Sequence, residues 1–515
     1  MSSSQNSHDQ STPVDSTAHT ETSSDVVRLG KHLKPHWVWA IALGSAIGWG
    51  AFILPADWMR DGGGPLAAML GLAIGGVLMI VIGASYGYLA RVFPVSGGAF
   101  AYTLVGFGRT HAFVCAWFMT LGYTSIVALN ASALALLGKH TVPQIIEVGH
   151  LYTVAGWDVY LGEIAVATLA LVLFAVVNAR GASLSGGVQF IFCLVMILAV
   201  LALVIGVIAS PAGSFSNVTP LTDGRVNPVV GVTVIVAIAP WAYIGFDNIP
   251  QAAEEFAFPA RKAFRLIVWS LIAAAALYCV MILVTASAAP WQDMMGEDRV
   301  WATADAVTSS MGGVGLALLV IAAVMGIVTG LNGFYVAGSR VLLALGRAQM
   351  IPRVFQRVHP RFGTPHAGLL FVMVAALAAP WFGRTALSWI VDMASIGFTF
   401  AFLYTSACAF RLLRWSGSAD RSALPGSAST WRKLASAAGV LIAVAFILLL
   451  LVPGSPAQLS VPSFMAMGVW IVIGAVFFAV RRSHSRTLTD EQVDQAVLGG
   501  PRPDFLVRNG AGARM

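Results

Sequence analysis

An acidic residue and a glycine interrupt one of the apolar stretches of this chain. Residues 241–255 read Trp-Ala-Tyr-Ile-Gly-Phe-Asp-Asn-Ile-Pro-Gln-Ala-Ala-Glu-Glu, which places Gly245 and Asp247 inside a hydrophobic run. A carboxylate at membrane depth costs about 2.5–3.5 kcal/mol on insertion scales, so it marks a functional site by default. A broken helix at that depth is tolerated only against protein or a water-filled cavity. Freed carbonyls there would suit an ammonium group, and Trp241 could stack on an organic cation. The structural alternative is a packed aromatic and a carboxylate bonded only to its own protein.

A second interruption lies in the first hydrophobic stretch, at Gly44-Ser-Ala-Ile-Gly-Trp-Gly50. Each glycine costs about 1 kcal/mol in a helix interior relative to alanine, so the cluster favours local unwinding. Unwinding frees N–H groups at the start of the following half-helix, where a carboxylate is favoured. Close packing of helices through the Gly44 and Gly48 pair is the alternative. Interrupted spans early in both halves of a chain are the best sequence indication of a secondary transporter's binding site.

The composition indicates a membrane protein. The 515 residues are 57% hydrophobic and only 10% charged, against about 25% charged in soluble domains. Apolar runs of about 20 residues, the length that crosses a bilayer, recur along most of the chain. The four cysteines all fall in apolar runs without metal or disulfide spacing. No nucleotide-binding loop, nucleophile elbow or zinc-protease motif occurs, so we expect no enzyme, no metal and no cofactor.

Hydropathy predicts an all-α integral membrane protein with twelve transmembrane helices, whose boundaries are uncertain by several residues. The predicted spans are 37–55, 65–90, 111–137, 161–179, 186–209, 231–253, 264–288, 313–345, 366–382, 386–410, 433–452 and 463–480. With the N-terminus inside, all but five of the 30 basic residues fall on the cytoplasmic side, as the positive-inside rule requires. The five are Arg60, Lys139, Arg225, Arg299 and Arg384. The net charge of +7 is thereby explained without nucleic acid.

Three regions follow from this topology. Residues 1–36 are predicted to form a disordered cytoplasmic tail, since the first 24 are rich in Ser, Thr, Gln and Asp. Residues 37–482 form the transporter domain. Residues 483–515 are predicted to form a second, similarly unpacked cytoplasmic tail.

At the two interruptions the chain resembles the amino acid–polyamine–organocation transporter superfamily. Gly48-Trp49-Gly50 with Pro55 is similar to the first-span pattern, and Tyr243-Ile-Gly-Phe-Asp247 with Glu254-Glu255 is close to the sixth-span signature. Further matching segments occur in family order at Phe93–Tyr102, Pro259-Ala-Arg-Lys262, Ser339-Arg340 through Pro365, and Ser395-Ile-Gly397. Together they cover nearly all of the membrane portion.

The resemblance implies two inverted five-helix repeats, spans 1–5 and 6–10, with two peripheral helices and with spans 1 and 6 discontinuous. It also implies alternating access, in which spans 1, 2, 6 and 7 rock against spans 3, 4, 8 and 9. If the roles of the family's binding residues apply at the matching positions of this chain, residues of span one would face a substrate's carboxylate. Residues of span six would face its amino group and side chain. The expected substrate-binding residues, with two from a polar stripe in span three, are Ser45, Ala46, Ile47, Gly48, Trp49, Gly50, Tyr123, Thr124, Trp241, Ala242, Ile244 and Asp247.

Two departures from the family pattern affect the expected mechanism. Trp49 stands where the family commonly has Ser, which removes a hydroxyl and adds a bulky indole. Several proton-coupled relatives carry a Lys in span five that stands in for a sodium ion, and Met196 aligns there. Asp247 is then the leading candidate for a titrating group, because burial raises a carboxylate's pKa and a cationic substrate lowers it.

Near the cytoplasmic surface, Glu254 and Glu255 are predicted to pair with Arg261, Lys262 or Arg340 as part of a gate. Thr120, Tyr123, Thr124, Val127 and Asn130 share a face of span three that could line the pocket or serve helix packing. Thr329 and Asn332 of span eight are candidates for contact with an ion or the substrate.

These observations favour a secondary transporter that moves an amino acid across the inner (cytoplasmic) membrane, by proton symport or exchange. The predicted partners are a small-molecule substrate, protons and the lipid bilayer. Alternative substrates are amines without a carboxylate, such as a polyamine or ethanolamine. A non-transporting membrane sensor on the same fold is the alternative from another class.

Overall fold

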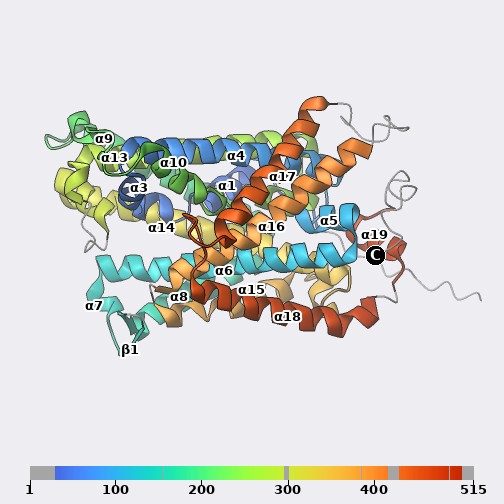
Figure 1. Ribbon diagram of the computed structural model, residues 1–515. Coiled ribbons are helices and arrows are strands. Elements are labelled where there is room, and N and C mark those ends of the chain that lie inside the picture. Colours follow the sequence, from blue (N-terminus) through green and yellow to red (C-terminus); the bar gives the residue numbers. More distant parts are fainter. Residues whose placement is uncertain are drawn as a thin grey trace, which may run out of the picture.

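The computed structural model describes residues 29–154, 156–294, 301–383, 385–415, 429–485 and 488–501. Long helices lie side by side and fill most of the molecule (Figure 1). The longer and interrupted helices are α1 (Pro35–Ile47), α2 (Gly50–Ile53), α3 (Pro55–Gly62), α4 (Pro65–Val92), α5 (Ala99–Phe107), α6 (Arg109–Thr141), α8 (Leu161–Ala179), α9 (Ala182–Ala209), α10 (Pro228–Ala237), α11 (Ala239–Ala242), α12 (Asn248–Gln251), α13 (Ala263–Ala288), α14 (Ala302–Arg347), α15 (His366–Ala376), α16 (Thr385–Trp415), α17 (Thr430–Leu451), α18 (Val461–Ser485) and α19 (Asp490–Leu498).

Short elements connect these helices. They are α7 (Pro143–Ile146), the antiparallel strands β1 (His150–Val154) and β2 (Trp157–Tyr160), and the 3-10 turns η1 (Phe215–Val218), η2 (Ala253–Glu255), η3 (Ala260–Lys262), η4 (Trp291–Met294), η5 (Arg353–Gln356) and η6 (Ala379–Phe382). Strand β1 and helix α19 lie at opposite ends of the bundle (Figure 1).

In the described part of the chain, nine helices are long and apolar enough to cross a membrane, and two shorter apolar helices cover Pro228–Ala237 and His366–Phe382. This confirms the predicted all-α membrane architecture. The count of twelve spans stays a prediction, since α1 has 13 residues and the sixth span is divided into short pieces. Helix α14 is two helices joined at Gly312, where φ is 61°, so its membrane part begins where the eighth span was predicted.

Helix packing follows the pattern that two five-span repeats would produce. Helix α6 packs on α16 as α14 packs on α9, and α1 packs on α13 as α10 packs on α4. In the predicted order, the first two contacts join span 3 to span 10 and span 8 to span 5, and the other two join span 1 to span 7 and span 6 to span 2. Each contact is thus repeated when spans 1–5 and spans 6–10 are exchanged. Helix α6 is buried almost throughout, whereas α18 exposes most of its apolar side chains. The repeat core therefore surrounds α6, and α18 lies at the periphery.

Both terminal segments are more ordered than the sequence predicted. Leu29 and Leu33 are buried, and the backbone of Leu33 pairs with Phe256 and Ala257. At the other end, Val493 and Val497 of α19 are buried, and Arg109 forms a 2.8 Å ion pair with Asp490. The prediction of unpacked tails is therefore wrong for these parts, because each presents two apolar side chains to the bundle. Residues 1–28 and 502–515 lie outside the described residues.

Candidate functional site

The first span is broken where the sequence predicted. Helix α1 ends at Ile47, and Gly48 has φ 44° and ψ −162°, after which α2 begins at Gly50. A Cβ added to Gly48 would meet nothing within 4 Å. Glycine is therefore required here by the left-handed backbone and not by lack of space.

The sixth span is broken at Gly245, between α11 and α12. Gly245 has φ 129°, and a Cβ there would lie 2.6 Å from the backbone nitrogen of Ala46. The two breaks are thus in backbone contact, and only a residue without a side chain permits that approach. Asn248 strengthens the contact by donating from Nδ2 to the Ser45 hydroxyl at 2.9 Å.

Tyr278 of α13 joins the two breaks from a third helix. Its hydroxyl lies 2.7 Å from the Ala46 carbonyl oxygen and 2.5 Å from that of Ala242. A phenol has one proton, so it donates to one of these carbonyls at a time. Ala242 belongs to the span-six residues expected to face a substrate's amino group, whereas Ala46 belongs to the span-one residues expected to face its carboxylate. Each carbonyl oxygen has a second lone pair that Tyr278 does not use.

A small cavity lies at the breaks, with a free volume of about 20 Å³, enough for about one water molecule. The indoles of Trp49 and Trp241 meet edge to face there, with ring centroids 6.1 Å apart. The lining residues are Ser45, Ala46, Ile47, Gly48, Trp49, Gly50, Ile126, Leu129, Asn130, Trp241, Ala242, Ile244, Tyr278 and Phe334. Within the described chain, this set contains no acidic or basic side chain.

Nine of the expected substrate-binding residues line this cavity, namely those of span one together with Trp241, Ala242 and Ile244. Tyr123, Thr124 and Asp247 do not. Sequence reasoning missed Ile126, Leu129, Tyr278 and Phe334 as site residues. The polar stripe in span three did include Asn130, and Ile126 and Leu129 flank that stripe, so helical periodicity could have found them.

Asp247 is fully buried behind the cavity lining. Its carboxylate accepts a hydrogen bond from the Tyr123 hydroxyl at 2.5 Å and another from the Gly245 N–H at 3.1 Å. Asp247 therefore connects the sixth-span break to α6. It reaches the cavity through the backbone of Gly245 rather than through its own side chain.

A neutral hydrogen-bond network holds α1 against α8, α9 and α14. Gln189 donates from Nε2 to the carbonyl oxygens of Ala40 and Thr329 at 3.2 and 3.1 Å, and its Oε1 accepts from Asn332 at 2.8 Å. Asn332 also bonds Asn178 and Ser185. The Thr329 hydroxyl bonds the Gly44 carbonyl at 3.0 Å. We name these five side chains, Asn178, Ser185, Gln189, Thr329 and Asn332, the bonded network. Met196, which aligns with the Lys of several proton-coupled relatives, lies on α9 as Gln189 does, and it is also buried.

The predicted gate residues form two buried ion pairs. Arg340 bonds Glu255 through two contacts of 2.8 and 3.2 Å, and Arg347 bonds Glu254 with the same two distances. The Leu29 N–H also donates to Glu254 at 2.8 Å. Burial opposes ionisation of Glu254, but the Arg347 guanidinium and the Leu29 N–H more than offset it and lower the pKa of that carboxyl. The pairing with Arg340 is confirmed, whereas Arg347 takes the place predicted for Arg261 or Lys262.

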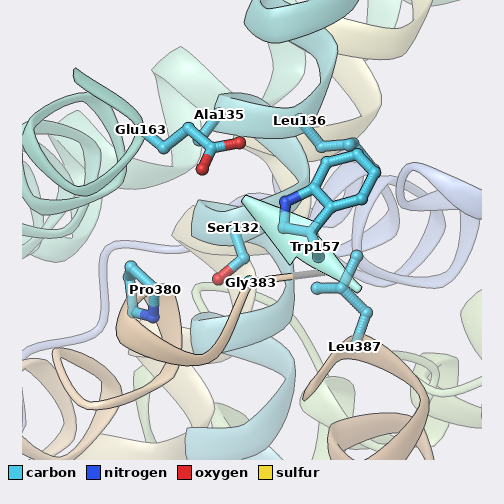
Figure 2. A pocket seen from close by; sticks show the side chains of 8 residues that line it. All are labelled: Ser132, Ala135, Leu136, Trp157, Glu163, Pro380, Gly383 and Leu387. Atoms are coloured by element: carbon cyan, nitrogen blue, oxygen red, sulfur yellow. The ribbon is translucent and has the colours of Figure 1, made fainter. Parts of the chain in front are cut away.

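A second cavity of similar volume lies toward the other end of α6. Figure 2 shows it between Ser132 of α6, Trp157 of the hairpin and Glu163 of α8, with Pro380 and Leu387 closing it. Lys139 lies 3.3 Å from the Glu163 carboxylate and over the Trp157 ring at 4.3 Å. These contacts attach the hairpin to the bundle. No residue of either helix break lines this second cavity. The cavity at the breaks is therefore the candidate binding site.

Two interrupted helices that touch through their backbones, surrounded by other helices, are the arrangement in which secondary transporters build their binding sites. Comparison with known sequences agrees: the amino acid permease family matches residues 37–477. The chain belongs to this family, and it is accordingly a transporter and not an enzyme.

Individual relatives are distant. The chain is 27% identical over 391 residues to cationic amino acid transporter 1 of Arabidopsis thaliana, covering 74% of this chain and 63% of that protein. It is 25% identical to the methylthioribose transporter of Bacillus subtilis, covering 69% and 76%. It is also 25% identical to a branched-chain amino acid permease of Lactococcus lactis, covering 73% and 81%. The match thus spans less than two thirds of the plant transporter.

Proposed function

We propose that this protein transports a neutral α-amino acid with an apolar side chain across the cytoplasmic membrane. The observation that carries the proposal is the lining of the cavity at the breaks, which within the described chain has backbone polar groups, mostly apolar side chains and the neutral polar side chains of Ser45, Asn130 and Tyr278, but no acidic or basic side chain. A zwitterion has no net charge, and its two ends can be met by N–H groups and carbonyls. A substrate that is only a cation would need a fixed carboxylate in contact with it.

In this proposal the substrate carboxylate faces the N–H groups around Gly48 to Gly50, where the first span resumes as a helix. The ammonium group faces the free lone pairs at Ala46 and Ala242. Ile126, Ile244 and Phe334 surround the side chain. Two relatives are named as a branched-chain amino acid permease and a cationic amino acid transporter, which supports an amino acid as the substrate. The mostly apolar lining favours an amino acid with an apolar side chain over a cationic one.

We further propose that both termini are cytoplasmic and that the ion pairs of Glu254 and Glu255 form the cytoplasmic gate. The described N-terminal segment at residues 29–33 lies at that gate, and the basic residues of the sequence gather at the same end. Asp247 is the proposed site of the coupling proton, since it is the buried carboxylate nearest the breaks. Proton binding there would act on the sixth-span break through Gly245 and on α6 through Tyr123.

Uptake by purified protein in proteoliposomes tests the function. The panel holds leucine, alanine, arginine, glutamate, ethanolamine and putrescine, each with and without an inward proton gradient. We expect leucine and alanine to enter and the gradient to increase their accumulation. Gly468→Ala is a control, since a Cβ there meets nothing within 4 Å and Gly468 is remote from the breaks.

Other outcomes distinguish the alternatives. Uptake of amines alone would contradict the neutral site and make Asp247 the substrate anchor. Binding of leucine without flux of any compound would support a sensor.

A further inference from the structure

Several buried polar side chains of the described chain have no well-formed hydrogen bond to protein. They come from several elements, and all are nearly or fully buried: Tyr86 of α4, Ser96, Tyr102 of α5, Gln251 of α12 and Thr405 of α16. Buried polar groups in native proteins are bonded in roughly nine cases of ten or more. A group that has no protein partner is usually a binding position for internal water.

Two of these groups, Gln251 and Ser96, lie in order between Asp247 and the gate. The Tyr123 hydroxyl bonds Asp247, and the amide of Gln251 lies beside that same hydroxyl. On its other side Gln251 faces the turn before α5, because a Cβ on Gly98 would lie 2.7 Å from Gln251 Nε2. Ser96 precedes this turn, and its hydroxyl lies beside the Glu254 carboxylate. The order Asp247, Tyr123, Gln251, Ser96, Glu254 therefore leads from the break to the gate.

Gln251 is the central member of this series. It is fully buried, and neither its Nε2 nor its Oε1 has a well-formed bond to protein. An amide offers two donors and two acceptor lone pairs. The contact with the Tyr123 hydroxyl meets at most one of them, and leaving the others unmet in an apolar interior would cost about 1–3 kcal/mol or more. Two or more water molecules between Tyr123 and Ser96 would meet this demand.

We propose that Gln251 and Ser96 position a file of internal water that conducts protons between Asp247 and the cytoplasmic gate. This rests on the proposed function, in which Asp247 takes up the coupling proton. When Asp247 releases its proton, the carboxyl O–H bond breaks and a new O–H bond forms on the Tyr123 hydroxyl, which passes its own proton to the first water and stays neutral. Each water then passes one proton onward and recovers one, so that only a carboxylate and one cytoplasmic proton result. Gln251 and Ser96 hold the water in line and are not themselves ionised.

The titratable groups along this series are Asp247, Tyr123, Glu254 and Arg347, with the Glu255–Arg340 ion pair at the gate. Tyr86 lies beside Asp247 and Tyr123, and Tyr102 and Cys115 lie beside Tyr86. The tyrosines and the cysteine are neutral at physiological pH in their ordinary state. Glu254 is already paired with Arg347. Asp247 is thus the member of this set whose charge change would dominate transport.

The test compares two transport modes of Gln251→Leu in proteoliposomes. Net accumulation of leucine driven by a proton gradient requires proton release to the inside, whereas counterflow exchange of labelled for unlabelled leucine does not. We expect Gln251→Leu to reduce gradient-driven accumulation about tenfold and to leave counterflow within about twofold of wild type. Gln251→Asn should restore most accumulation, because its amide still binds water. Ser96→Ala should give a smaller loss of the same kind.

Two results would overturn the proposal. One is gradient-driven accumulation by Gln251→Leu at the wild-type level with an unchanged pH profile. The other is an equal loss of accumulation and counterflow in both Gln251→Leu and Gln251→Asn, which would make Gln251 structural. If the wild-type protein shows counterflow but no response to the proton gradient, the proton-coupling part of the proposed function is wrong. Measuring the wild type first therefore separates failure of proton coupling from failure of the water route.

Discussion

Gln189 and Gln251 are both fully buried glutamines at membrane depth, but their surroundings differ. Gln189 makes three hydrogen bonds and joins α1 to α9 and α14. Gln251 makes none that is well formed. The contrast extends further, because the side chains of the bonded network all form well-formed hydrogen bonds, whereas those of Ser96, Tyr86 and Thr405 form none that is well formed.

This difference indicates two uses of buried polarity in one protein. The bonded network has no need of water and holds the inner half of the first span against the intact helices. It is neutral, so its bonds do not respond to pH. The region around Gln251 requires water and includes the buried carboxylate of Asp247. The first region therefore stabilises the packing of the first span against its neighbours, and the second region contains the proposed proton route.

The largest expected effect is that of Asp247→Asn. An amide still accepts from the Tyr123 hydroxyl but neither binds nor releases a proton in this pH range. Gradient-driven uptake should fall at least tenfold, to the level seen without a gradient, and the pH dependence of transport should disappear. Uptake between pH 5 and pH 8 measures this, with Asp247→Glu as the control that keeps a carboxyl group. An unchanged pH dependence would rule out the proton role of Asp247.

Replacement of each glutamine by leucine separates the two regions by stability. Gln189→Leu removes three bonds that are worth about 0.6 kcal/mol each in membrane proteins, about 2 kcal/mol together. Gln251→Leu removes no well-formed bond and adds apolar contact. We expect the Tm of Gln189→Leu to fall by several degrees and that of Gln251→Leu to stay near wild type, in a thermal unfolding assay in detergent. The shape of the pH profile should change only for Gln251→Leu. Equal falls in Tm would show that Gln251 has protein partners comparable to those of Gln189.

A smaller effect should distinguish two threonines in the same way. Thr329→Val loses the 3.0 Å bond from its hydroxyl to the Gly44 carbonyl, at a cost of about 0.6 kcal/mol. Thr405→Val loses no well-formed bond and should be neutral or slightly stabilising. Paired thermal unfolding curves measure the difference, and a larger loss for Thr405→Val would contradict the contrast between the regions.

Features that depend on a few neighbouring residues could be predicted from the sequence. Gly48 and Gly245 were expected to break their helices, and both do so at positive φ, because the preference of glycine for that conformation is local. Glu254 and Glu255 were expected to pair with Arg261, Lys262 or Arg340, and of these three Arg340 forms an ion pair, with Glu255.

Features that depend on distant partners could not be predicted in this way. Tyr278 lies 232 residues from Ala46, whose carbonyl it bonds, and nothing in the apolar run around Tyr278 marks that contact. Arg261 and Lys262 were considered as partners of Glu254 because they are close in sequence, but the partner is Arg347, 93 residues away. Whether a buried glutamine is bonded, as Gln189 is, or left for water, as Gln251 is, depends on side chains from other helices.

The pairing of the N-terminal segment with the gate also has a consequence for how the chain is made. Leu29 emerges from the ribosome 225 residues before Glu254, the residue its N–H contacts. At about 5–20 residues per second, the segment waits on the order of 10 to 50 s for its partner. Arg340 and Arg347 follow later still, so the ion pairs of Glu255 and Glu254 that accompany this contact can form only in the second half of synthesis.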